Sequence, residues 1–287
     1  MNMQKVGLAG AAVAAALITA TVPAAAQSTL EQAIENGYIR VGFANEAPFG
    51  YATPSGELTG EAPAIAKVIL ERMGIPEVDG VLTEFGSLIP GLQAGRFDII
   101  AAGMFINPQR CEQIAFSEPS YGIGQAFLVQ EGNPMGLNNY EDVANNPEAT
   151  LGVMSGAVEK GYAEAAGVPE DQIMSFPDGP SGLAAVRTGR ADAFALTSLS
   201  IANLVETVGE GAGVEMTQPF GEVAGQSVKG HGAFGFRKDD EELLQAFNAE
   251  LAEFIGSEEH IALVTPFGFG EDYLPNRTTA DLCQAEE

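Results

Sequence analysis

A phenylalanine and an arginine lie five positions apart in a connection that follows an apolar run. The run covers residues 97–102, and Phe105 and Arg110 come after it. An arginine side chain donates two parallel hydrogen bonds to a carboxylate, and a nearby aromatic face can bind another part of a small ligand. The pair therefore predicts a binding site for a small carboxylate. The alternative is that Arg110 only forms a salt bridge on a surface turn.

A second charged candidate follows the first predicted strand, residues 38–43. The loop Asn45-Glu46-Ala47-Pro48-Phe49-Gly50-Tyr51 comes directly after that strand. In open α/β sheets, ligands bind beyond the carboxyl ends of the strands. Glu46 gives such a site a negative group, so Glu46 and Arg110 together would bind both ends of a zwitterion. The alternative is that Glu46 is a solvated loop charge.

Three phenylalanines, Phe49, Phe85 and Phe105, each follow a predicted strand. Because the three loops begin at the edge where the cleft is expected, the rings are predicted to converge there. Converging rings bind delocalised or quaternary cations, and each good cation–π contact contributes about 0.5–2 kcal/mol. The alternative is ordinary core packing, which accounts for most phenylalanines.

A further candidate segment is Ser155-Gly156-Ala157-Val158-Glu159, which follows a predicted strand at 151–153 and is expected to open a helix. Backbone N–H groups at a helix start favour a carboxylate. Ser155, Gly156 and Val158 are therefore candidate ligand contacts. The alternative is that Ser155 only caps the helix.

These candidates must be positioned by short β-like runs that alternate with helical patterns, an arrangement typical of α/β lobes with largely parallel sheets. Strands are predicted at 38–43, 78–84, 98–102, 125–129, 151–153, 173–176, 191–196 and 231–236, and helices at 61–73, 88–94, 180–188 and 239–255. We expect a discontinuous first lobe, residues 27–127 plus 233–287, and a second lobe, residues 128–232. Two crossing strands would act as a hinge, and the ligand would bind in the interlobe cleft.

The first 26 residues have the pattern of a cleaved signal peptide. Lys5 precedes an apolar, alanine-rich stretch, and Ala24-Ala25-Ala26 is a small-residue cleavage site. We therefore expect a periplasmic protein that is cleaved near Ala26. Cleavage would change the net charge from −26 to −27, because Lys5 is the only charged residue removed. So acidic a surface argues against nucleic-acid partners and anionic membranes.

The cysteines and histidines restrict the chemistry further. Cys111 and Cys283 are the only cysteines, and an oxidising compartment permits a disulfide between them. The alternative is two free thiols. His231 and His260 are the only histidines, and no His/Cys cluster has metal-ligand spacing. We expect no metal, no cofactor and no catalytic residues, which favours a binding protein over an enzyme.

The segment GMFINPQRCEQIAFSEPSY at 103–121 resembles the type-3 solute-binding proteins of bacterial ABC importers. The resemblance extends over nearly all of residues 29–275. It implies a two-lobe periplasmic binding protein fold of type II, a monomer, and a membrane permease of an ABC importer as partner. In that family the arginine at the position of Arg110 clamps the ligand carboxylate. Asn107 replaces the usual threonine, and Glu118 and Ser120 also depart from the family pattern.

Residues 189–197 resemble a family strand whose second aspartate holds the α-ammonium group of an amino acid. In this chain that position is Thr197, a candidate ligand contact whose hydroxyl cannot pair with an ammonium.

Several features resemble the ectoine- and hydroxyectoine-binding subgroup: the loop at 45–51, the Phe105/Arg110 pair, the Arg110-Cys111 dipeptide and the C-terminal Cys283.

Ectoine is a cyclic amino acid derivative with a carboxylate and a delocalised amidinium cation, a small zwitterionic ligand. The resemblance implies that Arg110 binds its carboxylate and Glu46 its ring N–H groups. It also implies that Phe49, Phe85 and Phe105 surround the cation.

Two other functions stay open. A polar amino-acid or opine-binding protein of the same family is distinguished by whether Thr197 faces the ligand. A periplasmic dehydratase-like enzyme would need a positioned acid or base. Glu46 is the only plausible candidate for that role in the expected cleft.

Overall fold

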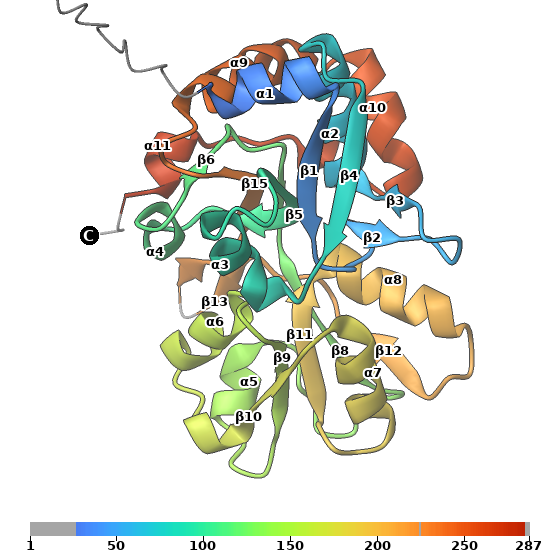
Figure 1. Ribbon diagram of the computed structural model, residues 1–287. Helices are drawn as coiled ribbons and strands as arrows, with labels where there is room; N and C mark the ends of the chain where they lie inside the picture. Colours follow the sequence, from blue (N-terminus) through green and yellow to red (C-terminus); the bar gives the residue numbers. More distant parts are fainter. Residues whose placement is uncertain (1–26, 224, 285–287) are drawn as a thin grey trace, which may run out of the picture.

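The computed structural model describes residues 27–223 and 225–284, which form two lobes that each contain a sheet (Figure 1). The predicted signal peptide, residues 1–26, lies outside the described residues. Within the described part of the chain, no helix is both long enough and apolar enough to cross a membrane.

The first lobe is built around a six-stranded sheet. Its elements are α1 (Thr29–Asn36), β1 (Tyr38–Phe43), β2 (Tyr51–Ala52), β3 (Leu58–Thr59), α2 (Glu61–Arg72), β4 (Glu77–Leu82), η1 (Phe85–Ser87), α3 (Leu88–Gln93), β5 (Ile99–Phe105), α4 (Pro108–Cys111), β6 (Ala115–Phe116), β7 (Tyr121–Ile123), β15 (Gly230–Phe236), α9 (Glu241–Phe254), α10 (Glu258–Val264), η3 (Thr265–Phe267), η4 (Glu271–Tyr273) and α11 (Thr279–Leu282). The strand order is β4-β1-β5-β15-β6, with β7 also paired to β15. β1 runs parallel to β4 and β5, whereas β15 runs antiparallel to its neighbours.

The second lobe is built around a five-stranded sheet in the order β10-β9-β11-β8-β12. Its elements are β8 (Gln125–Gln130), α5 (Tyr140–Ala144), β9 (Leu151–Met154), α6 (Glu159–Ala165), η2 (Glu170–Gln172), β10 (Ile173–Phe176), α7 (Gly179–Arg187), β11 (Ala193–Thr197), α8 (Ser198–Val208), β12 (Val214–Met216), β13 (Glu222–Val223) and β14 (Gln226–Ser227). β9, β10 and β11 are parallel, and β8 pairs antiparallel with β11 and β12.

The predicted α/β architecture with two lobes is confirmed, although the bounds of several elements differ from the predicted ones and the short strands β6, β7 and β12 are not among the predicted strands. β5 continues to Phe105 instead of ending at 102, because β15 pairs with it as far as that residue. The segment 155–159 does open a helix, but α6 begins only at its last residue, Glu159, and Val158 rather than Ser155 is the N-cap. Gly156 has a φ of 78°, and this left-handed conformation is incompatible with a right-handed helix.

The chain passes between the sheets twice. β7 ends at Ile123 in the first sheet, and β8 begins at Gln125 in the second. β15 returns the chain to the first sheet at Gly230. The lobe boundaries at 127/128 and 232/233 stay a prediction.

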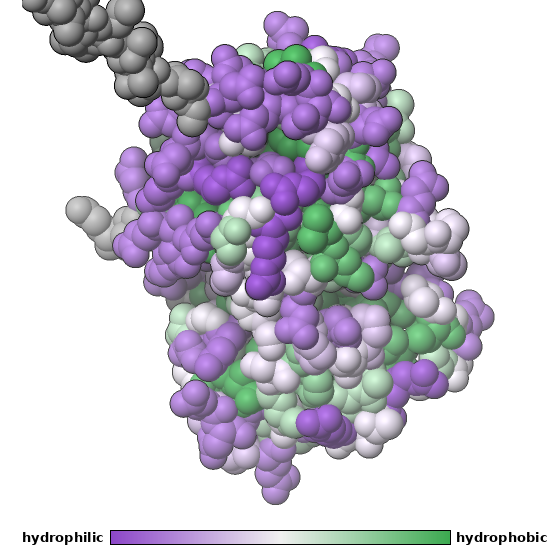
Figure 2. Space-filling model, viewed as in Figure 1, coloured by the Kyte–Doolittle hydropathy of each residue, from purple (hydrophilic) through white to green (hydrophobic). Residues whose placement is uncertain are grey.

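Apolar stripes attach the helices to the sheets. In α9, Leu243, Phe247, Leu251 and Phe254 recur at helical spacing and are at most 1% exposed. On the outside, hydrophilic residues cover most of the visible upper lobe, and hydrophobic residues gather near the junction between the lobes (Figure 2).

Candidate ligand-binding site

A cavity that is partly open to solvent lies between the lobes. Its wall consists of Glu46, Phe49, Phe85, Gly103, Phe105, Arg110, Met154, Ala157, Val158, Glu159, Leu196 and Thr197. Most of these residues lie at or just after the carboxyl ends of β1, β5, β9 and β11. This is the edge at which α/β sheets bind ligands.

Arg110 is presented to the cavity by the short helix α4. The Asn107 side chain caps this helix by accepting a hydrogen bond from the Arg110 backbone N–H at 2.8 Å, and Pro108 occupies its first turn. The guanidinium is buried, and it donates from Nη1 to Phe105 O at 2.6 Å and from Nη2 to Gly156 O at 3.0 Å. Arg110 therefore contacts both lobes and is not a surface-turn residue.

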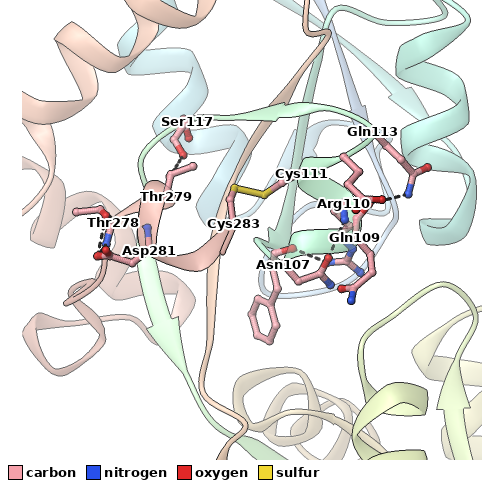
Figure 3. Close-up of a disulfide and its surroundings, with 12 residues drawn as sticks. Asn107, Gln109, Arg110, Cys111, Gln113, Ser117, Thr278, Thr279, Asp281 and Cys283 are labelled. Carbon is pink, nitrogen blue, oxygen red and sulfur yellow. Dashed lines mark hydrogen bonds between the residues drawn. A yellow bond between two sulfur atoms is a disulfide. The ribbon is translucent and has the colours of Figure 1, made fainter. Parts of the chain in front are cut away.

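A disulfide joins the residue after Arg110 to the C-terminal part of the chain (Figure 3). The sulfur atoms of Cys111 and Cys283 are bonded, which confirms the predicted bridge between residues 172 positions apart. Helix α11, next to Cys283, is also held by Thr279, whose Oγ1 donates to Ser117 O at 2.6 Å. The segment that carries Arg110 is thus fixed to the C-terminal helix.

Glu46 lies in a tight loop after β1. Its backbone N–H donates to Gly50 O at 2.9 Å, and its carbonyl accepts from the Gly50 N–H at 3.0 Å. Glu46 as a residue is half-buried, and its Oε1 accepts a hydrogen bond from Ser200 Oγ at 2.7 Å. Burial raises the pKa of Glu46 to about 7, although the Ser200 hydrogen bond and the Arg110 charge oppose the rise. Glu46 is therefore a cavity group rather than a solvated loop charge.

The three predicted phenylalanines all lie on the cavity wall. Phe49, Phe85 and Phe105 are 1%, 6% and 5% exposed. The Phe85 ring faces the Arg110 guanidinium, whose Cζ lies 5.5 Å from the ring centroid. Tyr121 packs against both Phe49 and Phe105, with ring centroids 5.1 and 6.2 Å apart. The three phenylalanine rings therefore belong both to the hydrophobic core and to the cavity wall.

In the second lobe, Val158 and Thr197 line the cavity, whereas Ser155 and Gly156 are not part of its wall. Gly156 contributes the carbonyl that accepts from Arg110. Thr197 is the N-cap of α8, and its Oγ1 accepts a hydrogen bond from the Ser200 N–H at 3.4 Å.

Glu159 is a cavity residue that is not among the predicted ligand contacts. It is 2% exposed, and burial raises its pKa to about 8. With the Gln125 amide nitrogen facing Glu159, this amide donates to Glu159 Oε1 at 3.0 Å and to Leu196 O at 3.1 Å. Within the described part of the chain, Glu159 Oε2 has no hydrogen-bond partner. The position of Glu159 soon after β9, at the same edge as the other candidates, is the signal that identifies it.

Comparison with known proteins assigns the family. The model of the bacterial extracellular solute-binding proteins, family 3, matches residues 39–270. The chain belongs to this family. It is 39% identical over 281 residues to the "Probable amino-acid ABC transporter periplasmic-binding protein y4tE" of Sinorhizobium fredii (strain NBRC 101917 / NGR234), with 95% of this chain and 92% of that protein covered.

Two solved structures resemble this family-3 protein over most of their length. The crystal structure of EhuB in complex with hydroxyectoine has a TM-score of 0.82 and 38% identity, covering 90% of this chain and 98% of that chain. The ancestral amino acid-binding protein AncCDT-1, a precursor of cyclohexadienyl dehydratase, has a TM-score of 0.73 and 28% identity, covering 84% and 99%. The protein is a solute-binding protein of an ABC importer with the predicted type II fold, and its relatives support a periplasmic location.

Proposed function

We propose that this protein captures ectoine or hydroxyectoine in the periplasm and delivers it, as a monomer, to the membrane permease of an ABC importer. The observation that carries the proposal is the cavity wall, which combines the Arg110 guanidinium, the Glu46 carboxylate and three phenylalanine rings. Ectoine and hydroxyectoine carry the matching groups, a carboxylate and a cyclic amidinium cation. The similarity to EhuB, whose structure contains hydroxyectoine, supports the same ligand class.

Arg110 is the anchor for the carboxylate in this proposal. A guanidinium has five N–H donors, and here one on each terminal nitrogen is used by a backbone carbonyl. The remaining N–H groups suit a carboxylate that approaches from the cavity. In the closed cleft the two carbonyl contacts fix the plane of the guanidinium, so the remaining N–H groups are held in place for the carboxylate.

The charges around the cavity suit a ligand with no net charge. Glu159, with a pKa near 8, is mostly protonated at neutral pH. Glu46 has a pKa near 7, and a ligand cation beside it favours its ionised form. The ionised Glu46 then balances Arg110, and a zwitterion adds no uncompensated charge to the buried site.

A polar amino acid or an opine is the second candidate ligand, because the y4tE relative is named as a probable amino-acid binder. Thr197 argues against a standard α-amino acid, since its hydroxyl carries no charge to pair with an α-ammonium group.

We also propose that the protein is a binding protein and catalyses no reaction, because the AncCDT-1 relative is itself described as a binding protein.

A thermal-shift panel tests the ligand class, because a ligand that binds only the folded state raises the melting temperature. Ectoine and hydroxyectoine are expected to raise it clearly, whereas glutamine, histidine, arginine and glutamate leave it unchanged. Glycine betaine, which lacks N–H groups to donate to Glu46, is expected to have a small effect. If a standard amino acid raises the melting temperature and ectoine does not, the proposed ligand is wrong. The assignment as a solute-binding protein would still hold.

A further inference from the structure

The hydroxyl of Ser200 makes a hydrogen bond outside its own helix, α8. Serine and threonine hydroxyls in helices commonly donate to the carbonyl four residues earlier. Thr188, Thr207 and Thr265, which lie in or at the end of helices, do so at 2.8, 2.8 and 2.7 Å. Ser200 instead donates to Glu46 Oε1 at 2.7 Å, across 154 positions of sequence.

This hydrogen bond connects the two lobes. Ser200 lies in the first turn of α8, which follows β11 of the second sheet. Glu46 lies in the loop that follows β1 of the first sheet. Helix α8 lies at the junction between the lobes (Figure 1). The hydroxyl therefore reaches Glu46 only while the lobes are close together.

We propose that Ser200 is a positioning residue that orients Glu46 for the ligand and latches the closed cleft. Ser200 is 1% exposed, so water competes little for its hydroxyl. By binding Oε1, the hydroxyl leaves Oε2 for an N–H group of the ligand. The role in ligand binding rests on the proposed function, whereas the latch between the lobes does not depend on which ligand binds.

Ser200 also affects the ionisation of Glu46. Arg110 on α4 stabilises the Glu46 carboxylate, whereas Glu159 on α6 and Tyr121 on β7 are acidic groups near enough to interact with it. The Ser200 hydrogen bond lowers the pKa of Glu46 against the effect of burial. Loss of the hydroxyl therefore raises the pH at which Glu46 ionises and at which a cationic group binds to it.

The chain offers matched variants for a test. Ser200→Ala removes the hydroxyl, and Ser198→Ala makes the same change at another buried serine of α8. Ser200→Thr keeps the hydroxyl.

Small-angle X-ray scattering of the ligand-free protein and calorimetry with hydroxyectoine between pH 5 and 8 provide the test. Ser200→Ala is expected to increase the radius of gyration, because the open form becomes more populated. It is also expected to weaken hydroxyectoine binding about tenfold, since a hydrogen bond to a charged group is lost, and to shift the midpoint of the affinity–pH curve upward. Ser198→Ala and Ser200→Thr are expected to match the wild type.

An unchanged radius of gyration in Ser200→Ala would overturn the latch. An unchanged affinity and midpoint would overturn the positioning role, as would equal losses in Ser198→Ala. If the wild type does not bind hydroxyectoine, the proposed function and the positioning role for that ligand both fail. The scattering comparison still decides the latch in that case.

Discussion

Acidification is predicted to weaken ligand binding through Glu46. In the closed cleft, burial raises the pKa of this carboxyl to about 7. An amidinium cation beside Glu46 favours its ionised form and lowers that pKa in the complex. Below pH 7, binding must therefore displace a proton from Glu46, and the affinity falls as the pH falls.

The size of the effect follows from the pKa. With a pKa of about 7, roughly 1% of Glu46 is ionised at pH 5, so the affinity there is about 100-fold lower, or about 2.7 kcal/mol weaker, than on the plateau. The ligand carboxylate and amidinium do not titrate between pH 5 and 8. Glu159, with a pKa of about 8, keeps its proton below pH 7 and adds little to the slope.

Isothermal titration calorimetry with hydroxyectoine from pH 5 to 8 measures this dependence. Two buffers with different enthalpies of ionisation report the proton released on binding. Glu46→Gln is the matched control, because it keeps the shape of the side chain and removes its titration. The variant is expected to bind more weakly at pH 8 and to show almost no slope. A constant wild-type affinity across this range, or the same slope in both proteins, would refute the reasoning.

Three further predictions follow from other parts of the structure. Arg110→Ala should cost about 2–5 kcal/mol of binding free energy in the same calorimetric assay, since the carboxylate loses its charged partner, and an unchanged affinity would place the site elsewhere. The Cys111→Ser/Cys283→Ser variant should lose up to about 5 kcal/mol of unfolding free energy in urea, because the disulfide closes a long loop. Two alkylatable thiols in the native wild-type protein, detected by mass spectrometry, would contradict the bridge. Burial raises the pKa of Glu61 to about 8, so the folded state retains a proton that the unfolded chain releases above about pH 4.5. Between pH 5 and 8 this carboxyl should therefore lower the free energy of unfolding by about 3 kcal/mol. Glu61→Gln should make the melting temperature less dependent on pH in thermal unfolding. The same pH dependence in both proteins would argue against this role of Glu61.

Local sequence signals were sufficient for most strands. β1 and β10 have the predicted bounds, because each is a short apolar run between turn signals. The start of α6 was not predictable in the same way. The chain makes a turn at Gly156 first: the Ala157 N–H donates to Met154 O at 3.1 Å, and this turn delays the helix until Glu159. A Cβ atom on Gly156 would also lie 2.5 Å from Gly86 Cα in the other lobe, so the position has no room for a side chain in the closed cleft.

The candidate site shows the same division between local and tertiary information. Glu46, Phe49 and Arg110 were found because each follows the carboxyl end of a predicted strand, and the cavity lies at that edge. Glu159 does not stand out in the sequence, because an acid in the first turn of a helix is ordinarily explained by the helix dipole. Ser200 has no signal in the sequence, because its partner Glu46 lies in the other lobe and local sequence pattern does not encode that contact.

A crystal structure of the protein grown with hydroxyectoine tests the central claim most directly. The account predicts one ligand in the interlobe cavity, with its carboxylate on the Arg110 guanidinium, its ring N–H on Glu46 and its ring between the phenylalanines. Hydroxyectoine bound outside this cavity, or bound within it without contact to Arg110 and Glu46, would contradict the account.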